Sequence, residues 1–433
     1  MIPAQGIAME EVSATHAEIA TKRGEEPPRM ISLERLGQGL LVVLLLIGFP
    51  LALARVVNGG CTDFTGFCEA GQYVLDHGAR APTSVMGRYW PSADVPWVLF
   101  ACIPLWIGAT LWYAVGCVSW FGLLRTIGLD LLAGSEEIVR RQSTLAAGLL
   151  VAPLAIDGLC LGSFHILVIW LMLAGLLRAN RGQACSGGIL LGVAVWLKLL
   201  PLLGVGYLLL KRRWTPALIA AACAVSLDVI LSLGAFGAKG AWQEHVAWWN
   251  HGAAGSTLRQ LTSPRVVDED RLTNQSVAVT LRRLLSSLGA EPASPRQSVV
   301  MAHFTPGQLE AAFLIATALL AMAVAAFCRR PEGETPAVQG PMEIALIVLA
   351  TLWFSPVVWS YHLTAATPAL AMLLTRHRAA GRWRAIAIVV IVWPLALCLL
   401  AWPVARALGV LLWLSLLLGA ALVRTRRSGP YMC

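Results

Sequence analysis

Residues 36–57 read LGQGLLVVLLLIGFPLALARVV. A predominantly apolar stretch of this length is typical of a membrane-crossing helix, which needs roughly 20 such residues. The composition of the 433-residue chain agrees, because 57% of the residues are hydrophobic and only 13% are charged. A soluble domain carries about 25% charged residues. The sequence therefore predicts an all-α polytopic membrane protein.

Further apolar segments predict a bundle of about twelve transmembrane helices. Besides the first, they cover residues 95–124, 144–156, 164–177, 185–197, 199–210, 216–235, 307–327, 344–353, 357–374, 385–402 and 408–423. Several are shorter than a full crossing, so they must be shielded by protein or line a wet cavity. We expect residues 34–424 to form a single transmembrane domain, between a disordered cytoplasmic tail at 1–33 and a second cytoplasmic tail at 425–433.

The basic residues predict the orientation. If the N-terminus is cytoplasmic and every segment crosses, 21 of the 33 Lys and Arg residues lie on the cytoplasmic side, as the positive-inside rule requires. Both termini are then cytoplasmic in a multi-pass cell-membrane protein, and the loops 58–94 and 236–306 are extracytoplasmic. The net charge of +9 has the same explanation, and since no nucleic-acid-reading motif is present, we expect no nucleic-acid partner.

Polar residues from distant parts of the chain fall on the outer side in this topology. They belong to the 58–94 loop, to the turn 157–165, to the break 198–201 and to the turn 355–362. The loop 236–306 adds Trp242, His245, Trp248 and Trp249, which suit an interfacial amphipathic helix. We expect one wet site at the extracytoplasmic face.

Asp63 is the first chemical candidate in that site. It follows the first span in CTDFTGFCEA, residues 61–70, where a carboxylate near the membrane face can take a proton from a hydroxyl nucleophile. The alternative is a solvated acid or a helix N-cap. Glu69 has a weaker version of the same role, and Cys61 and Cys68 can pair if the loop faces an oxidising compartment.

Three further side chains stand out from apolar surroundings. Lys198, within VWLKLLP at 195–201, either snorkels to the interface or binds an anion such as a lipid phosphate. His362 can position or protonate a phosphate or an acceptor, or be structural. Asp228 lies inside an apolar segment, where acids are costly, and the sequence suggests no partner for it.

Several short motifs give the chain a resemblance to glycosyltransferase family 87, the polyprenol-phosphate-mannose-dependent mannosyltransferases of the GT-C class. In chain order they are Asp-Phe-x-x-Phe-x-x-Ala from Asp63, Tyr89-Trp90-Pro91, Gly162-Ser163-Phe164-His165, Gly188 to Gly192, Lys198-Leu199-Leu200-Pro201, Asn274-Gln275-Ser276 with a downstream Arg, and Ser355-Pro356-x-x-Trp359-x-x-His362. Ser163 and His165 replace the family's usual Gln and Asn, and Tyr361 stands where a His is common.

The resemblance implies a GT-C-like bundle with loop or re-entrant elements at the outer face. It implies that Asp63 is the catalytic base and that His362 lines the site. The expected substrate-binding residues are Glu69, Tyr89, His165, Lys198, Asn274, Gln275, Arg282 and Trp359. No metal ligands and no cofactor are expected.

The predicted function is that of an integral-membrane hexosyltransferase. It moves a hexose, with mannose as the leading candidate, from a polyprenyl-phosphate donor to a hydroxyl of a lipid-linked or cell-envelope glycan, so its partners are that donor, a glycan or glycolipid acceptor and membrane lipids. A membrane-embedded donor agrees with the lack of a Gly-rich phosphate loop in the sequence. The alternative is a transporter or flippase of lipid-linked sugars, which often shows repeats with broken helices. A structural membrane partner would leave the polar outer residues unexplained.

Overall fold

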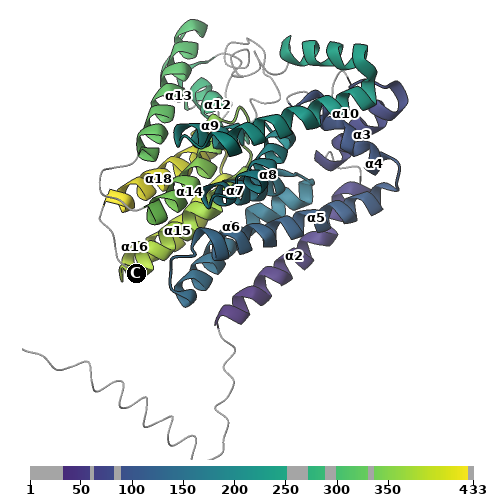
Figure 1. The fold of residues 1–433 in the computed structure, drawn as a ribbon. Coiled ribbons are helices and arrows are strands. Elements are labelled where there is room, and N and C mark those ends of the chain that lie inside the picture. Colours follow the sequence, from purple (N-terminus) through teal and green to yellow (C-terminus); the bar gives the residue numbers. More distant parts are fainter. Residues whose placement is uncertain are drawn as a thin grey trace, which may run out of the picture.

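The computed structural model describes residues 33–58, 63–81, 89–250, 272–287, 299–329 and 336–427, and every regular element in these ranges is helical (Figure 1). The α-helices are α2 (Leu33–Val57), α3 (Asp63–His77), α4 (Val98–Ala101), α5 (Leu105–Thr126), α6 (Glu137–Leu161), α7 (His165–Asn180), α8 (Ala184–Leu197), α9 (Leu202–Leu210), α10 (Trp214–Trp248), α12 (Val277–Leu285), α13 (Pro306–Cys328), α14 (Pro336–Phe354), α15 (Thr367–Ala379), α16 (Trp383–Cys398), α17 (Pro403–Ala407) and α18 (Val410–Arg427). Short 3₁₀ or π turns are η1 (Pro91–Trp97), η2 (Ile127–Leu131), η6 (Ser360–Ala366) and η7 (Leu399–Ala401). The predicted all-α fold is confirmed.

Six of the described helices are long and apolar enough to cross a membrane. They are α2, α5 with its π-turn extension, α6, α10, α13 and α16, and shorter apolar helices cover His165–Asn180, Ala184–Leu197 and Gly340–Phe354. Each of the twelve apolar segments of the sequence overlaps a helix. The polytopic membrane class is therefore confirmed.

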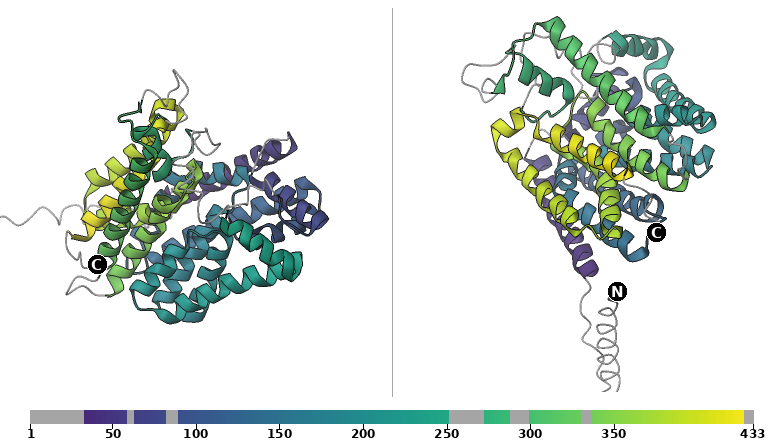
Figure 2. Two further views of the ribbon diagram at one scale, coloured as in Figure 1. Left: turned by 90° about the horizontal axis from the view of Figure 1, so that it is seen from above. Right: turned by 90° about the vertical axis from the view of Figure 1, so that its left-hand side faces the viewer.

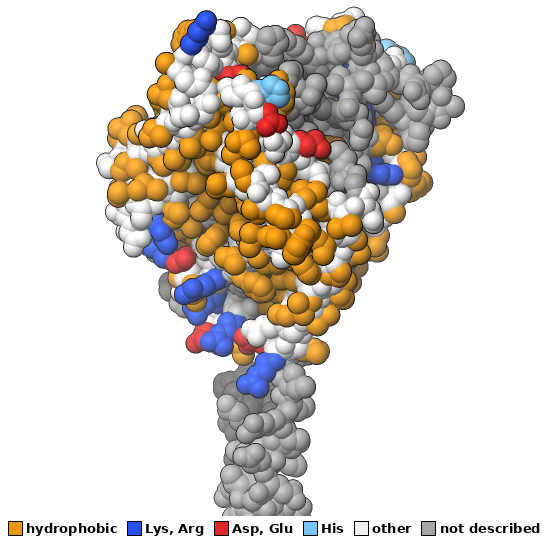
Figure 3. Space-filling view, turned by 90° about the vertical axis from the view of Figure 1, so that its right-hand side faces the viewer, with side chains coloured by type: hydrophobic (Ala, Val, Ile, Leu, Met, Phe, Trp, Pro, Cys, Tyr) orange, Lys and Arg blue, Asp and Glu red, His pale blue; other side chains and the backbone are white. Residues whose placement is uncertain are grey.

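The surface has the character of a membrane protein. Figure 3 shows a broad hydrophobic area on the face that includes α2 and α5, with Lys and Arg side chains gathered below it. On α2, Leu46 and Ile47 are 66% and 54% exposed. An apolar patch of this size is unfavourable in water, whereas the hydrocarbon region of a bilayer accommodates it.

The helices form two neighbouring groups. In Figures 1 and 2, α2 to α10 lie on one side and α13 to α18 on the other. Within the first group, glycines of α8 allow close helix packing: a Cβ at Gly187 would lie 2.6 Å from the backbone of Ala179 on α7, and one at Gly188 would lie 2.7 Å from Ile219 on α10. Small residues permit such approaches between membrane helices, which accounts for the glycines at 187, 188 and 192.

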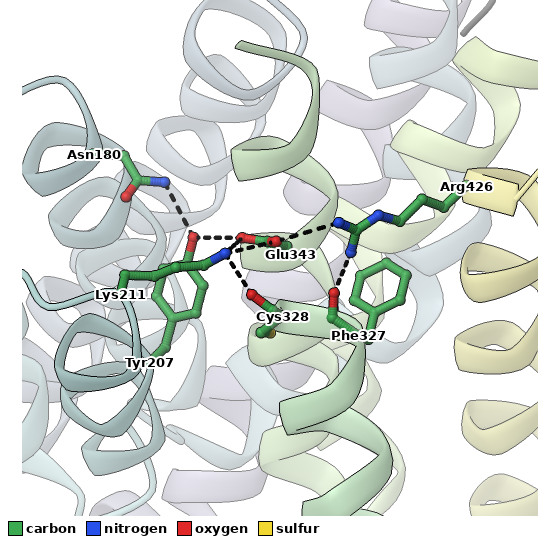
Figure 4. Close-up of polar contacts among 7 residues, drawn as sticks. All are labelled: Asn180, Tyr207, Lys211, Phe327, Cys328, Glu343 and Arg426. Atoms are coloured by element: carbon green, nitrogen blue, oxygen red, sulfur yellow. Dashed lines mark hydrogen bonds and ion pairs between the residues drawn. The ribbon is translucent and has the colours of Figure 1, made fainter. Parts of the chain in front are cut away.

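A buried carboxylate joins the two groups at one end (Figure 4). Glu343 on α14 accepts a hydrogen bond from Tyr207 Oη at 3.0 Å and pairs with Lys211 Nζ at 2.7 Å and with Arg426 on α18 at 3.6 Å. Lys211 also donates to the carbonyl of Cys328, and Arg426 donates to the carbonyl of Phe327, both at the end of α13. One acid therefore compensates two cations and fixes the ends of four helices, α9, α13, α14 and α18.

Two predicted segments differ in detail from the structure. The apolar stretch 95–124 is divided, because its first residues form η1 and α4, and α5 begins only after Pro104. The predicted loop 58–94 contains α3, whose Phe64 and Phe67 pack against Trp97 with ring centroids 6.3 and 4.5 Å apart. Tertiary contacts of aromatic residues thus order a segment that reads as a loop.

The loop 236–306 begins as a helix, which its aromatic residues 242–249 indicate. α10 continues to Trp248 across a kink at Gly237, whose φ of 67° is a conformation that favours glycine. After the kink Trp242 is exposed, whereas Trp248 stacks on Trp90 with centroids 5.3 Å apart. The second half of α10, α3 and α12 all lie at the upper end of the bundle in Figure 1.

Candidate active site

Four side chains from three distant segments meet at this end of the molecule. Asp63 is the first residue of α3, Lys198 lies in the break between α8 and α9, and Tyr361 and His362 belong to η6. The hydroxyl of Tyr361 donates to Asp63 Oδ2 at 3.1 Å. Nζ of Lys198 lies 2.9 Å from Nε2 of His362. Two consecutive residues of η6 therefore connect a carboxylate with an ammonium group.

The segment before η6 is held by Asn274 and Gln275. Oδ1 of Asn274 accepts hydrogen bonds from the backbone N–H groups of Ser276 at 3.1 Å and Val358 at 3.0 Å. The backbone N–H of Gln275 donates to the carbonyl of Val358 at 2.7 Å, and its side chain donates to the carbonyls of Leu272 and Arg406. Both side chains are buried, so the structure places them as positioning residues for the turn that carries His362.

The hydrogen bonds of His362 define its protonation. The backbone N–H of Trp359 donates to Nδ1 at 2.8 Å. An imidazole nitrogen that accepts a hydrogen bond carries no proton, so the ring of His362 is neutral. A neutral imidazole that accepts at Nδ1 carries its proton on Nε2. Nε2–H and the ammonium of Lys198 are then both donors and do not hydrogen-bond each other, an arrangement that suits an anionic oxygen in contact with both.

Asp63 lies in surroundings that favour proton uptake. Burial raises the pKa of this carboxyl, and the nearby Asp157 acts in the same direction, against the lowering effects of the Tyr361 hydrogen bond and the Lys198 charge. A base is most effective when its pKa approaches the working pH. The hydroxyl of Tyr361 is the donor in its hydrogen bond to Asp63.

Asp157 on α6 is a neighbour that the sequence does not single out. Its Oδ2 accepts a hydrogen bond from Ser360 Oγ at 2.7 Å, and its Oδ1 lies 3.8 Å from the guanidinium of Arg55. The available signal was an acid directly after the apolar segment 144–156. Its contact with the first residue of η6 could not be read from the sequence.

Gly162 fixes the approach of α3 to α6. Its φ is 73°, and a Cβ there would lie 2.4 Å from Cβ of Phe64, the residue after Asp63. The carbonyl of Gly162 accepts a hydrogen bond from Nε1 of Trp112 at 2.8 Å. A glycine is therefore required both for the left-handed conformation and for the space next to the catalytic candidate.

The other predicted site residues range from fully buried to exposed. His165 is buried, and its Nε2 lies 3.1 Å from the carbonyl oxygen of His362. Tyr89 is half-buried, with its ring edge-to-face on Phe164, and Trp359 is also half-buried. Arg282 is buried on α12, the helix that follows Asn274 and Gln275. Glu69 is exposed on α3.

Asp228 has partners that the sequence did not suggest. Its Oδ1 accepts hydrogen bonds from the backbone N–H of Ser92 at 3.1 Å and from Ser92 Oγ at 2.7 Å, and its Oδ2 pairs with His245 Nε2 at 2.5 Å. Nε1 of Trp196, two residues before Lys198, donates to Ser92 Oγ at 2.8 Å. Asp228 thus connects both halves of α10 with η1 and the end of α8.

Few of the described side chains are arranged so that they could hold a metal ion or a cofactor. Within the ranges that the structure describes, no three His, Cys, Asp or Glu side chains lie close enough to hold a metal ion. Cys68 is buried on α3, whereas Cys61 lies outside the described residues.

Comparison with known proteins identifies the family of the chain. A polyprenol-phosphate-mannose-dependent alpha-(1-2)-phosphatidylinositol mannoside mannosyltransferase of Mycolicibacterium smegmatis is 31% identical over 257 residues, which are 56% of this chain and 51% of that protein. The chain spans about half the length of this curated relative. No solved structure matches the chain. The model of glycosyltransferase family 87 matches residues 89–356. This range includes Lys198 and Asn274 but neither Asp63 nor His362. With more than half of its residues matched, the chain belongs to glycosyltransferase family 87.

Proposed function

We propose that the protein transfers a hexose, mannose in the first instance, from a polyprenyl-phosphate donor to a hydroxyl group of a glycolipid or cell-envelope glycan. The observation that carries the proposal is the connection of Asp63 to Lys198 through Tyr361 and His362. It supplies a proton acceptor and a pair of anion-binding donors within one site. The printed name of the relative, a polyprenol-phosphate-mannose-dependent mannosyltransferase, supports this choice of donor.

The reaction would be a direct displacement at the anomeric carbon. Asp63 takes the proton of the acceptor hydroxyl while that oxygen forms a bond to the anomeric carbon. The bond from this carbon to the phosphate oxygen breaks, and polyprenyl phosphate leaves with the electron pair. Negative charge grows on the phosphate during this step, so donors from Lys198 and His362 stabilise the transition state more than the bound donor lipid.

The decisive experiment replaces Asp63 by Asn. The substitution retains the size of the side chain but removes its ability to accept the proton, and a general base typically contributes about a hundred- to ten-thousandfold. Purified protein is incubated with labelled polyprenyl-phosphate mannose and a lipid extract, and the labelled product is measured. Asp63→Asn should lose transfer and still bind the donor.

Glu69→Gln is the matched control, because Glu69 is an exposed carboxylate on the same helix. It should remain close to the wild type. Full transfer by Asp63→Asn would reject the proposed base, and loss of donor binding would make Asp63 a binding residue. Donor lipid that crosses the membrane unchanged, without any transfer, would favour a flippase.

We further propose that the site faces the extracytoplasmic side and that both termini are cytoplasmic. The basic residues support this orientation. Single cysteines at the exposed positions Ala133 and Gln243, introduced into a cysteine-free protein, test it. A membrane-impermeant thiol reagent should label position 243 in intact cells and position 133 only after permeabilisation, and the reverse result would reject the orientation.

A further inference from the structure

The last turn of α8 places Lys198, which follows directly after the helix. The backbone N–H of Lys198 donates to the carbonyl of Ala194 at 3.0 Å, and its φ and ψ of −155° and 134° are extended. A lysine side chain is long and flexible, so the ammonium group keeps its position beside His362 only if the backbone that carries it is fixed. The contacts that hold the end of α8 therefore also direct the ammonium group.

Two indole groups attach this turn to η1 and the residue before it. Nε1 of Trp196 donates to Ser92 Oγ at 2.8 Å, and both residues are buried. Nε1 of Trp90 donates to the carbonyl of Val195 at 3.1 Å. This carbonyl belongs to the last turn of α8, where a helix leaves its carbonyls without intrahelical partners. The end of α8 is thus fixed at two consecutive residues shortly before Lys198.

α10 in turn holds this segment from both sides of its kink. Before the kink, Oδ1 of Asp228 accepts hydrogen bonds from Ser92 Oγ at 2.7 Å and from the backbone N–H of Ser92 at 3.1 Å. After the kink, Trp248 stacks on Trp90 with ring centroids 5.3 Å apart. Because an indole N–H can only donate, Ser92 Oγ accepts from Trp196 and donates its own O–H to Asp228.

His245 is the partner of the buried acid on the other side. Its Nδ1 lies 2.7 Å from the carbonyl oxygen of Ala241, so Nδ1 carries a proton, and its Nε2 lies 2.5 Å from Asp228 Oδ2. A contact of this length between an imidazole nitrogen and a carboxyl oxygen requires a proton between them. Asp228 is therefore paired although it lies in an apolar segment, where an unpaired acid is costly.

We propose that Asp228, Ser92 and Trp196 are positioning residues, which hold the end of α8 so that the Lys198 ammonium meets the leaving phosphate. The inference rests on the proposed function, in which Lys198 stabilises that phosphate. Residues that act through Lys198 should matter no more than Lys198 itself. Their substitution should also have no further effect once Lys198 has been removed, because effects on one shared group are not additive.

A double-mutant cycle with Lys198→Ala tests this dependence. Trp196→Phe removes the indole N–H and retains an aromatic ring. With Lys198 present it should lower kcat roughly tenfold, or about 1.4 kcal/mol, and change KM for polyprenyl-phosphate mannose less than about twofold. With Lys198→Ala present it should change kcat less than about twofold. Equal losses of kcat in the two backgrounds would reject positioning through Lys198. Ser92→Ala replaces Trp196→Phe in the cycle if the latter does not fold.

Trp353→Phe is the matched control. Nε1 of Trp353 on α14 also donates to a buried serine hydroxyl, Ser415 Oγ on α18 at 3.0 Å. The same chemical change is therefore made between two other helices. Its kcat should remain close to that of the wild type, and a loss as large as that of Trp196→Phe would reject a specific role of the Trp196 contact.

The imidazole of His362 reports the position of Lys198 without requiring turnover. In full-length protein with isotopically labelled histidine nitrogens, the His362 signal is identified by its loss in His362→Gln. Lys198→Ala should shift this signal, because a positive charge is removed from the side of Nε2. Trp196→Phe should shift it in the same direction, and Trp353→Phe should not.

The two measurements separate the inference from the proposed function. If the wild type transfers no sugar but Trp196→Phe still shifts the His362 signal, the proposed function fails and the positioning of Lys198 stands. If the wild type is active and the His362 signal of folded Trp196→Phe is unshifted, the positioning is rejected and the proposed function is unaffected.

Discussion

Lys198 Nζ and His362 Nε2 lie 2.9 Å apart although 164 residues separate them in the chain. The backbone N–H of Trp359 occupies Nδ1 of the imidazole, so the proton of neutral His362 is on the nitrogen next to the lysine. Two donors this close suit an anionic oxygen that accepts a hydrogen bond from both. The pair is therefore the expected position of the donor phosphate.

Removing the charge of Lys198 should slow the reaction. Lys198→Ala is expected to lower kcat roughly ten- to a thousandfold, as for the loss of one electrostatic donor. Lys198→Arg should retain part of the rate, because the charge remains while the geometry changes. Steady-state kinetics with labelled donor measure both variants. Wild-type kcat in Lys198→Ala would mean that this lysine only snorkels.

A methyl group at Gly162 should displace Asp63, the proposed base, without contacting it directly. Gly162→Ala introduces a Cβ 2.4 Å from Phe64 and opposes a φ of 73°, so α3 and Asp63 must shift. We expect kcat to fall at least about tenfold, as misplacement by about 1 Å has large effects on rate.

Gly206→Ala is the control for this change. Nothing lies within 4 Å of a Cβ built at Gly206, which is inside α9. Its activity should be unchanged and its stability equal or slightly higher, since Ala is favoured over Gly in a helix by about 1 kcal/mol. Equal activity of Gly162→Ala and Gly206→Ala would contradict the packing argument.

The sequence predicted the helices better than their contacts. The apolar segments alone located a helix for every one of the twelve, although only six of the described helices have the length that a full crossing requires. It could not show that Tyr361 reaches Asp63 across 298 residues, since such a contact depends on how helices pack. Lys198 and His362 were both singled out, but only their placement in space makes them a pair.

Asp228 illustrates the same limit. Its cost inside an apolar segment was visible, but its partners Ser92 and His245 lie in η1 and beyond the Gly237 kink. The kink returns α10 towards its own middle, which no helical periodicity predicts. Asn274 and Gln275 are predicted to bind substrate, and their support of the turn before His362 could not be read from the sequence.

The Glu343 cluster should control stability rather than catalysis. Glu343→Ala leaves Lys211 and Arg426 largely buried without their common carboxylate, and breaking such a buried pair typically costs about 3–5 kcal/mol. The apparent melting temperature in detergent should fall clearly. Glu137→Ala, which breaks the exposed Glu137–Arg141 pair, should cost at most about 1 kcal/mol. Equal melting temperatures for the two variants would count against a stabilising role of the pairs that Glu343 forms with Lys211 and Arg426.

The pH dependence of transfer should report on Asp63 through two opposite changes. The base acts in its deprotonated form, so kcat/KM is lost as the pH falls through the pKa of Asp63. The hydrogen bond from Tyr361 lowers this pKa and the charge of Asp157 raises it. Tyr361→Phe should therefore move the acid limb to higher pH, and Asp157→Asn should move it to lower pH.

Profiles of kcat/KM against pH for the wild type and both variants provide the measurement. Any titration of the substrates is common to all three proteins and cannot produce shifts of opposite sign. A structural defect alone would lower the whole profile without moving its acid limb. If both variants move the limb in the same direction, or neither moves it, the titrating group is not Asp63, and the assignment of the base must be abandoned even if Asp63→Asn is inactive.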